Sequence, residues 1–133
     1  MSFGFDRNFD ADTLVVGPGC SRDSLIQKQL KQLIKQHRKS VIIDAEGLRM
    51  FQDWHELIDI LQPHPGPRQC ILTPHPGELK ALLKLFQDSN SGNFEDMTQE
   101  LNQIGITLLA KDAYTILYSP DCEPLVLGKP NVQ

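Results

Sequence analysis

A stiff loop near the middle of the sequence carries an imidazole and a carboxylate close together. The loop is Thr73-Pro74-His75-Pro76-Gly77-Glu78, in which two prolines and a glycine sit within six residues. Proline fixes its own φ angle, so the backbone here has few conformations to choose from. Histidine is the side chain that titrates nearest neutral pH. The loop therefore indicates side chains placed for binding or catalysis.

The other histidines do not extend this loop into a metal site. Pro63-His64-Pro65-Gly66 precedes the same predicted strand, and a strand of about five residues spans roughly 16 Å, which places His64 and His75 at opposite ends of it. His55 lacks a second histidine four residues on, because Asp59 stands there, so the helix of a zinc protease is not present. We expect no protein-held metal.

Three further segments could contact a ligand, and each has a structural alternative. Gly17-Pro18-Gly19 either lets backbone approach a ligand or forms a plain turn, and it is no dinucleotide fingerprint because Arg22 replaces the third glycine. Asp44 either holds a ribose hydroxyl or a magnesium-bound water, or caps a helix. Lys111 either reaches phosphate oxygens or is solvated.

The elements around these residues alternate between strand and helix. Strands are predicted at 13–16, 41–43, 70–72, 106–110, 115–118 and 124–127, and helices at 23–39, within 46–61, from 79 and at 94–104. This order is typical of an α/β fold with a mostly parallel sheet, here with an antiparallel hairpin at one edge. The carboxyl ends of parallel strands share one edge, so the glycine turn, Asp44 and the histidine loop are expected to meet in one crevice.

Composition narrows the class of protein. A net charge of -4 gives no positive field for a nucleic acid. Three well-separated cysteines, an odd number, favour a reducing compartment. The absence of a long apolar run argues against a membrane span and, with the missing signal sequence, indicates the cytoplasm, with the mitochondrion as the alternative. The sequence leaves a homo-oligomer open.

Four segments read in order resemble the NAD(P)H-hydrate dehydratases. They are Val15-Val16-Gly17-Pro18-Gly19, Asp44-Ala45-Glu46-Gly47-Leu48, Thr73 to Glu78, and Lys111-Asp112-Ala113-Tyr114-Thr115. The resemblance runs from about Leu14 to Leu127 and implies a ribokinase-like three-layer αβα sandwich. It further implies dehydration of hydrated NADH or NADPH back to NAD(P)H, driven by ATP or ADP with Mg²⁺.

The resemblance also implies which residues act. Those expected to bind the hydrated cofactor are Gly17, Gly19, Asp44, Thr73, Pro74, His75, Pro76, Gly77, Glu78 and Leu79. Those expected to bind the nucleotide are Lys111, Asp112, Ala113, Tyr114 and Thr115. Family members continue into a glycine-rich segment whose aspartate is the catalytic base. That segment would lie beyond Gln133, so we expect residues 1–133 to be one partial domain, truncated at both ends, without the catalytic residue.

Two positions depart from the family pattern. Glu46 stands where an aspartate is usual, and Asp112 where a glycine normally lets the nucleotide lie against backbone, so its negative charge is expected to weaken ATP binding. Two alternatives to a dehydratase stay open: a non-catalytic remnant that binds nucleotide or a partner, and a vitamin-precursor kinase of the same superfamily.

Overall fold

The structure is a computed structural model that describes residues 13–17, 23–37, 39–62, 69–120 and 122–128. Its six-stranded sheet has the order β1-β2-β3-β4-β5-β6. The strands are β1 Thr13–Val16, β2 Ser40–Asp44, β3 Cys70–Thr73, β4 Ile106–Lys111, β5 Thr115–Tyr118 and β6 Leu125–Gly128. The first four run parallel, and β5 and β6 add antiparallel at the far edge. The predicted α/β class, mostly parallel sheet and terminal hairpin are confirmed.

The helices begin at polar caps, as their sequences require. They are α1 Ser24–Gln36, the 3₁₀ helix η1 Ala45–Met50, α2 Trp54–Leu61, α3 Pro76–Ser89 and α4 Phe94–Gln103. Asp23 and Asp53 accept backbone N–H groups at the first turns of α1 and α2, and Asn93 forms a capping box with Asp96 in α4. The first helix was predicted to reach Lys39, but it ends at Gln36. His37 already has extended backbone there, and the chain enters β2 at Ser40.

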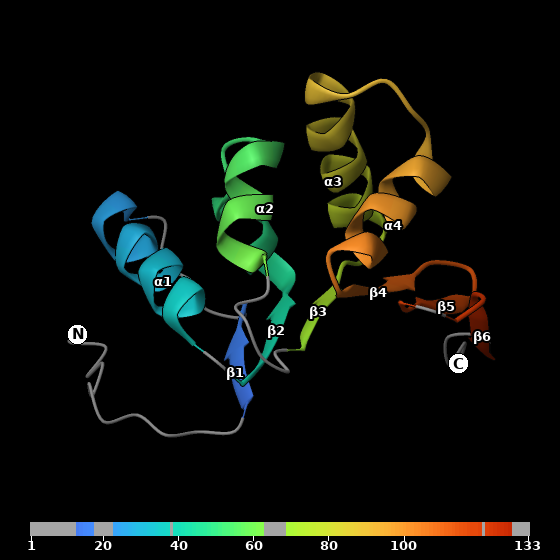
Figure 1. Ribbon diagram of the computed structural model, residues 1–133, viewed down its shortest axis with the longest axis horizontal. Helices are drawn as coiled ribbons and strands as arrows, with labels where there is room; N and C mark the ends of the chain where they lie inside the picture. The colour runs from blue at the N-terminus through green and yellow to red at the C-terminus, as the bar shows by residue number, and fades with distance from the viewer. Residues whose placement is uncertain (1–12, 18–22, 38, 63–68, 121, 129–133) are drawn as a thin grey trace.

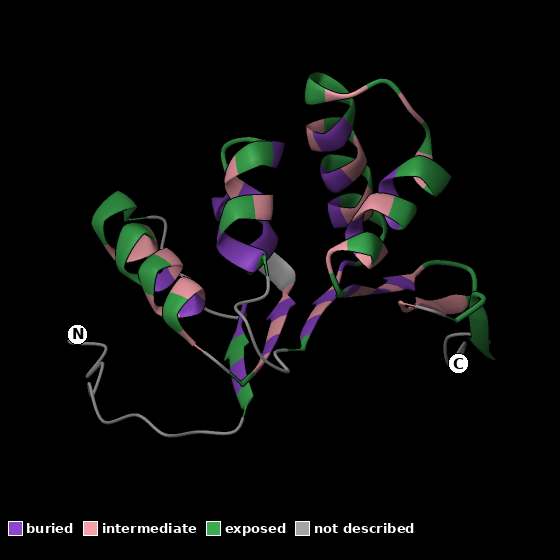
Figure 2. Ribbon diagram, viewed as in Figure 1, coloured by how far each residue is buried: buried purple, intermediate pink, exposed green. Residues whose placement is uncertain are grey.

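All four α-helices lie on one face of the sheet, as Figure 1 shows. Each parallel crossover adds the next strand on the same side of the last one, and right-handed crossovers that always advance in one direction place their helices on one face. Buried and partly buried residues alternate along β2, β3 and β4, as the colours of Figure 2 show. Successive side chains of a strand point to opposite faces, so the buried set is the one that faces the helices. The described residues thus form two of the three predicted layers. None of them makes a helix on the opposite face.

The core lies between this sheet face and the helices. It contains Val41, Ile43, Leu72, Ile106 and Leu108 from the strands, all fully buried. Lys31 of α1 donates to Glu56 of α2 at 2.9 Å, which ties these two helices together. Within the described ranges, no helix has the length and apolar character needed to cross a membrane.

Candidate functional site

Polar side chains from three neighbouring strands meet at the carboxyl edge of the sheet. Asp44 ends β2, Thr73 ends β3 and Lys111 ends β4. By strand alternation all three project from the face opposite the helices, because their neighbours Ile43, Leu72 and Ala110 are the buried set.

A direct contact joins two of these strand ends. The Lys111 Nζ lies 3.6 Å from Asp44 Oδ1, so the two side chains form an ion pair that spans the end of β3. The Thr73 hydroxyl donates to the carbonyl of Ile43 at 3.4 Å. Asp44 and the end of β3 that leads into the histidine loop thus lie side by side, as predicted, and Lys111 joins them.

The glycine after β1 is required by packing against β2. A methyl group added at Gly17 would overlap the Asp44 carbonyl oxygen and lie 2.6 Å from its carbonyl carbon. Gly47 has a similar role from the other side, since a methyl group there would come within 3.0 Å of the Val16 carbonyl oxygen. The close backbone approach that the sequence suggested for Gly17 is thus made to Asp44, and it fixes the position of that residue at the carboxyl edge of the sheet.

The histidine loop is held by a capping box at the start of α3. His75 is the N-cap residue, its Nδ1 accepts from the Glu78 backbone N–H at 3.4 Å, and Glu78 Oε1 accepts from the His75 N–H at 3.1 Å. The His75 Nε2 lies 3.4 Å from Glu78 Oε2. The Glu78 side chain is 2% exposed, whereas the His75 ring is 54% exposed. Both ring nitrogens therefore face Glu78, and the open part of the imidazole faces outward.

Glu78→Ala is expected to lower the free energy of unfolding by about 1–2 kcal/mol, because it removes one half of a capping box and leaves the His75 N–H without its acceptor. Glu78→Gln keeps an acceptor oxygen in place and should cost less than half of this. Urea unfolding followed by circular dichroism measures both. Equal stability of wild type and Glu78→Ala would show that the capping box does not hold the loop.

The predicted nucleotide segment forms the turn between β4 and β5. The Asp112 N–H donates to the Tyr114 carbonyl at 3.1 Å, which closes the turn, and Lys111 pairs with Thr115 across the hairpin. The Lys111 N–H donates to the Pro74 carbonyl at 3.2 Å, so this turn is joined to the histidine loop. Asp112, Ala113 and Tyr114 are exposed. The two predicted groups of residues thus share one edge.

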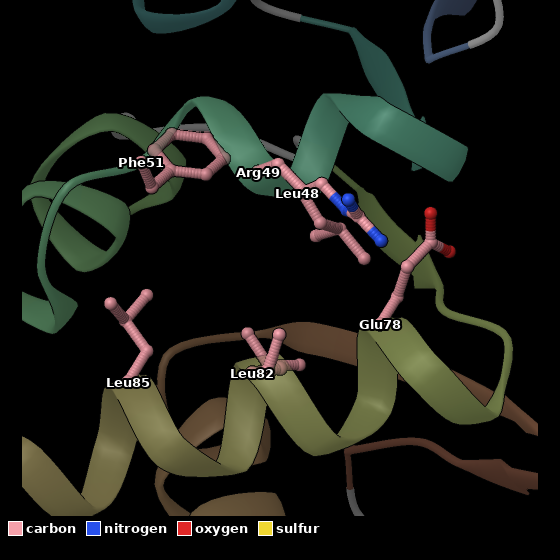
Figure 3. Close-up of a pocket in the computed structure, with 7 residues that line it drawn as sticks. Leu48, Arg49, Phe51, Glu78, Leu82 and Leu85 are labelled. Carbon is pink, nitrogen blue, oxygen red and sulfur yellow. The ribbon is translucent and has the colours of Figure 1, made fainter.

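One pocket beside this edge was not anticipated from the sequence. It has a volume of about 200 Å³ and lies between η1 and α3, on the helix side of the sheet. Leu48, Phe51, Leu82 and Leu85 give it apolar walls, and the head groups of Arg49 and Glu78 lie toward the same end in Figure 3. No motif in the sequence marked Arg49 as a candidate site residue.

A second pocket lies away from the strand ends. It has a volume of about 400 Å³ between α4 and the β5–β6 connection, with Phe94, Asn102 and Tyr118 among its lining residues. Tyr118 pairs with Leu108 on the amino side of Lys111 in β4. Burial raises the pKa of the Tyr118 phenol above its ordinary value of 10.0. This pocket shares no lining residue with the predicted site.

Some predicted residues lie outside the described part of the chain. These are Pro18, Gly19, Arg22 and His64. The described residues otherwise place every predicted site residue, from Gly17 to Thr115, at or next to the carboxyl edge of the sheet.

A mostly parallel sheet with its polar groups at the carboxyl edge defines the class of fold, and solved structures share it. A ribokinase-like superfamily protein from Enterococcus faecalis superimposes on 87% of this chain with a TM-score of 0.60 and 22% identity. An ADP/ATP-dependent NAD(P)H-hydrate dehydratase from Bacillus subtilis, co-crystallised with ATP/Mg²⁺, superimposes on 86% with a TM-score of 0.55 and 20% identity. The fold is ribokinase-like, as the sequence resemblance implied.

Sequence comparison then gives the family. Residues 3–131 match the family model for NAD(P)H-hydrate dehydratase. The chain belongs to the NAD(P)H-hydrate dehydratase family. It is 30% identical over 120 residues to an ADP-dependent (S)-NAD(P)H-hydrate dehydratase of Lactococcus lactis, and 34% identical over 119 residues to an ATP-dependent (S)-NAD(P)H-hydrate dehydratase of Saccharomyces cerevisiae.

The match covers only part of these relatives. The match to the Lactococcus lactis protein covers 88% of this chain but 40% of that protein, and the match to the Saccharomyces cerevisiae protein covers 83% and 34%. The two solved chains are covered to 38% as well. The chain thus spans well under half the length of the family members it matches.

Proposed function

We propose that this chain carries the crevice in which a nucleotide-dependent NAD(P)H-hydrate dehydratase brings hydrated NADH or NADPH next to ATP or ADP. The observation that carries this proposal is the meeting of Asp44, Thr73 and Lys111 at one edge, with the His75 loop bonded to the same edge. A lysine and several hydrogen-bonding groups around a shared opening suit a phosphate donor and a polyhydroxyl acceptor.

The residues divide into a cofactor side and a nucleotide side. On the cofactor side, the loop from Thr73 to Leu79 would contact the hydrated nicotinamide. His75 would act through its exposed ring, since both of its nitrogens face Glu78. The His75 ring would therefore pack against the nicotinamide and would not act as the base of the reaction. On the nucleotide side, Lys111 would place a positive charge on the phosphates, and the exposed turn up to Thr115 would flank them.

The reaction in this family makes a poor leaving group into a good one. Transfer of a phosphoryl group to the ring hydroxyl forms a carbon–oxygen–phosphorus link. Phosphate then departs with that oxygen while the ring loses a proton and regains its double bond. Positioning and charge neutralisation account for most of the catalysis in such transfers. The described residues of this chain would supply positioning and the cation of Lys111.

The edge fits a magnesium–nucleotide complex better than a bare ion. No group of three or more metal-ligating side chains gathers among the described residues. Mg²⁺ commonly takes one or two carboxylates and completes its shell with phosphates and water. Asp44 is paired with Lys111, so phosphate and water would supply most of the shell of the ion. The ion would neutralise the charge on the transferred phosphoryl group.

Turnover and binding are tested with the same reagents. Purified chain with ATP, Mg²⁺ and hydrated NADH is expected to bind both small molecules, and a return of NADH absorbance would show that it also turns over. Lys111→Ala should weaken ATP binding about tenfold, as expected for loss of a charged phosphate contact. Calorimetric titration measures this. Unchanged ATP affinity in Lys111→Ala would refute the proposed nucleotide side.

Binding without turnover would favour the second proposal, a module that holds nucleotide or cofactor without catalysing the reaction. The short span of the match to its relatives is the observation behind it. A cytoplasmic location remains a prediction from the sequence.

A further inference from the structure

The ion pair between Lys111 and Asp44 lies between the two proposed subsites. The predicted cofactor side includes Asp44 and the predicted nucleotide side includes Lys111, yet their charged groups are 3.6 Å apart. To reach each other they cross the end of β3, which lies between β2 and β4 in the sheet. The cation assigned to the nucleotide is thus already engaged by a carboxylate.

We propose that Asp44 is a positioning residue that competes with nucleotide phosphate for Lys111 and thereby couples the two subsites. A phosphate that takes Lys111 separates the Asp44 carboxylate from this cation, and the carboxylate can then accept a hydrogen bond from a hydroxyl of the hydrated cofactor. Nucleotide binding would prepare the cofactor side. This inference rests on the proposed function, in which Lys111 contacts the nucleotide.

The surroundings of the pair are consistent with an exchange of partners. The side chains of Lys111 and Asp44 are 42% and 35% exposed, so an incoming anion can reach the lysine without opening the core. Their backbones, in contrast, are fixed: Gly17 packs against the Asp44 carbonyl, and the Lys111 N–H is bonded to Pro74. Only side-chain rotation is needed to break the pair, because the strand ends are held.

Charge decides the direction of the effect. Asp44 could help nucleotide binding by orienting Lys111, or hinder it by occupying Lys111 and repelling phosphate. Orientation of a partly exposed lysine is worth little. A phosphate that takes Lys111 must separate it from a carboxylate 3.6 Å away, and this costs more because the effective dielectric near a protein surface is well below that of water. The hindrance therefore outweighs the help.

The test is a double-mutant cycle on ATP affinity, measured by calorimetry on the full chain with Mg²⁺. Asp44→Asn is expected to tighten ATP binding about 3- to 10-fold, since it removes the charged competitor for Lys111 but leaves the shape of the side chain. Lys111→Ala should weaken it about tenfold. In the Lys111→Ala background Asp44→Asn should tighten ATP binding much less, because the competition for the lysine is gone and only weak repulsion of the phosphate is left.

Asp112→Asn is the matched control. It removes one exposed carboxylate from the same edge, next to Lys111 in the chain, and its effect should persist in the Lys111→Ala background. Thermal unfolding checks that each variant is folded, and little change is expected because a partly exposed ion pair contributes little to stability.

The outcomes separate this inference from the proposed function. If Lys111→Ala weakens ATP binding but Asp44→Asn leaves it unchanged or weaker, the competition is refuted and the nucleotide side stands. Equal tightening by Asp44→Asn with and without Lys111 also refutes it. If Lys111→Ala has no effect, the proposed nucleotide side fails, and the coupling fails with it.

Discussion

Gly17→Ala is expected to lower the free energy of unfolding by about 3 kcal/mol or more, at the upper end of what overpacking costs. The added methyl group would overlap the backbone carbonyl of Asp44, and neither strand can move away because β1 and β2 are paired along four residues. Urea unfolding followed by circular dichroism measures the loss. The variant should also bind hydrated NADH more weakly, since the displaced Asp44 belongs to the proposed cofactor side.

Gly77→Ala provides the matched control. Its added methyl group would meet only the exposed His75 ring, at 3.3 Å, and an alanine in the first turn of a helix reduces the freedom of the unfolded chain. We expect a change within about 0.5 kcal/mol of wild type. A loss at Gly77 as large as that at Gly17 would mean that glycine is needed for a reason other than the contact with Asp44.

Trp54→Ala is expected to cost about 3–5 kcal/mol, the range for removing a large aromatic side chain from a core. Trp54 is 1% exposed, packs edge to face on Phe86 with ring centroids 5.0 Å apart, and donates to Glu100 at 3.1 Å. It therefore joins α2 to both α3 and α4. The same unfolding experiment applies, and loss of the cooperative transition is the extreme result.

Two further variants in α2 separate the contribution of the Trp54 ring from that of its hydrogen bond to Glu100. Trp54→Phe keeps a ring against Phe86 but removes the donor to Glu100, so its cost should be nearer about 1–2 kcal/mol. His55→Ala, one residue along and exposed, should change stability by less than about 0.5 kcal/mol. If Trp54→Ala were no worse than Trp54→Phe, the ring would not be what holds the helices together.

Local patterns were enough to predict most of the elements. β-branched runs such as Val41-Ile42-Ile43 and the apolar stripe of α1 are set by residues close in sequence, and both appear where expected. Element ends were less well predicted. The sequence around Lys39 has no glycine or proline to stop a helix, and α1 ends earlier because the chain must enter β2 beside β1 and β3.

The site was predictable in its location but not in its contacts. Residues at the carboxyl ends of parallel strands must share an edge, so the convergence of Asp44 with the histidine loop followed from the fold class, whereas the contact of Asp44 with Lys111 was not predicted. Their direct pairing depends on strand order and on which face each side chain takes, and neither is contained in a local pattern. The capping box at His75 left a trace, a glutamate three residues on, but histidine is not among the residues that favour the N-cap position.

The order of the strands has a consequence for how the chain folds. Each strand pairs with the strand that precedes it in the sequence, from β1 through β6. When each of the strands β2 to β6 leaves the ribosome, the strand with which it pairs has therefore already been synthesised. Pairing between consecutive strands keeps the closed loops shorter than pairing of strands from opposite ends of the chain would. The sheet can thus grow at one edge, by one strand at a time.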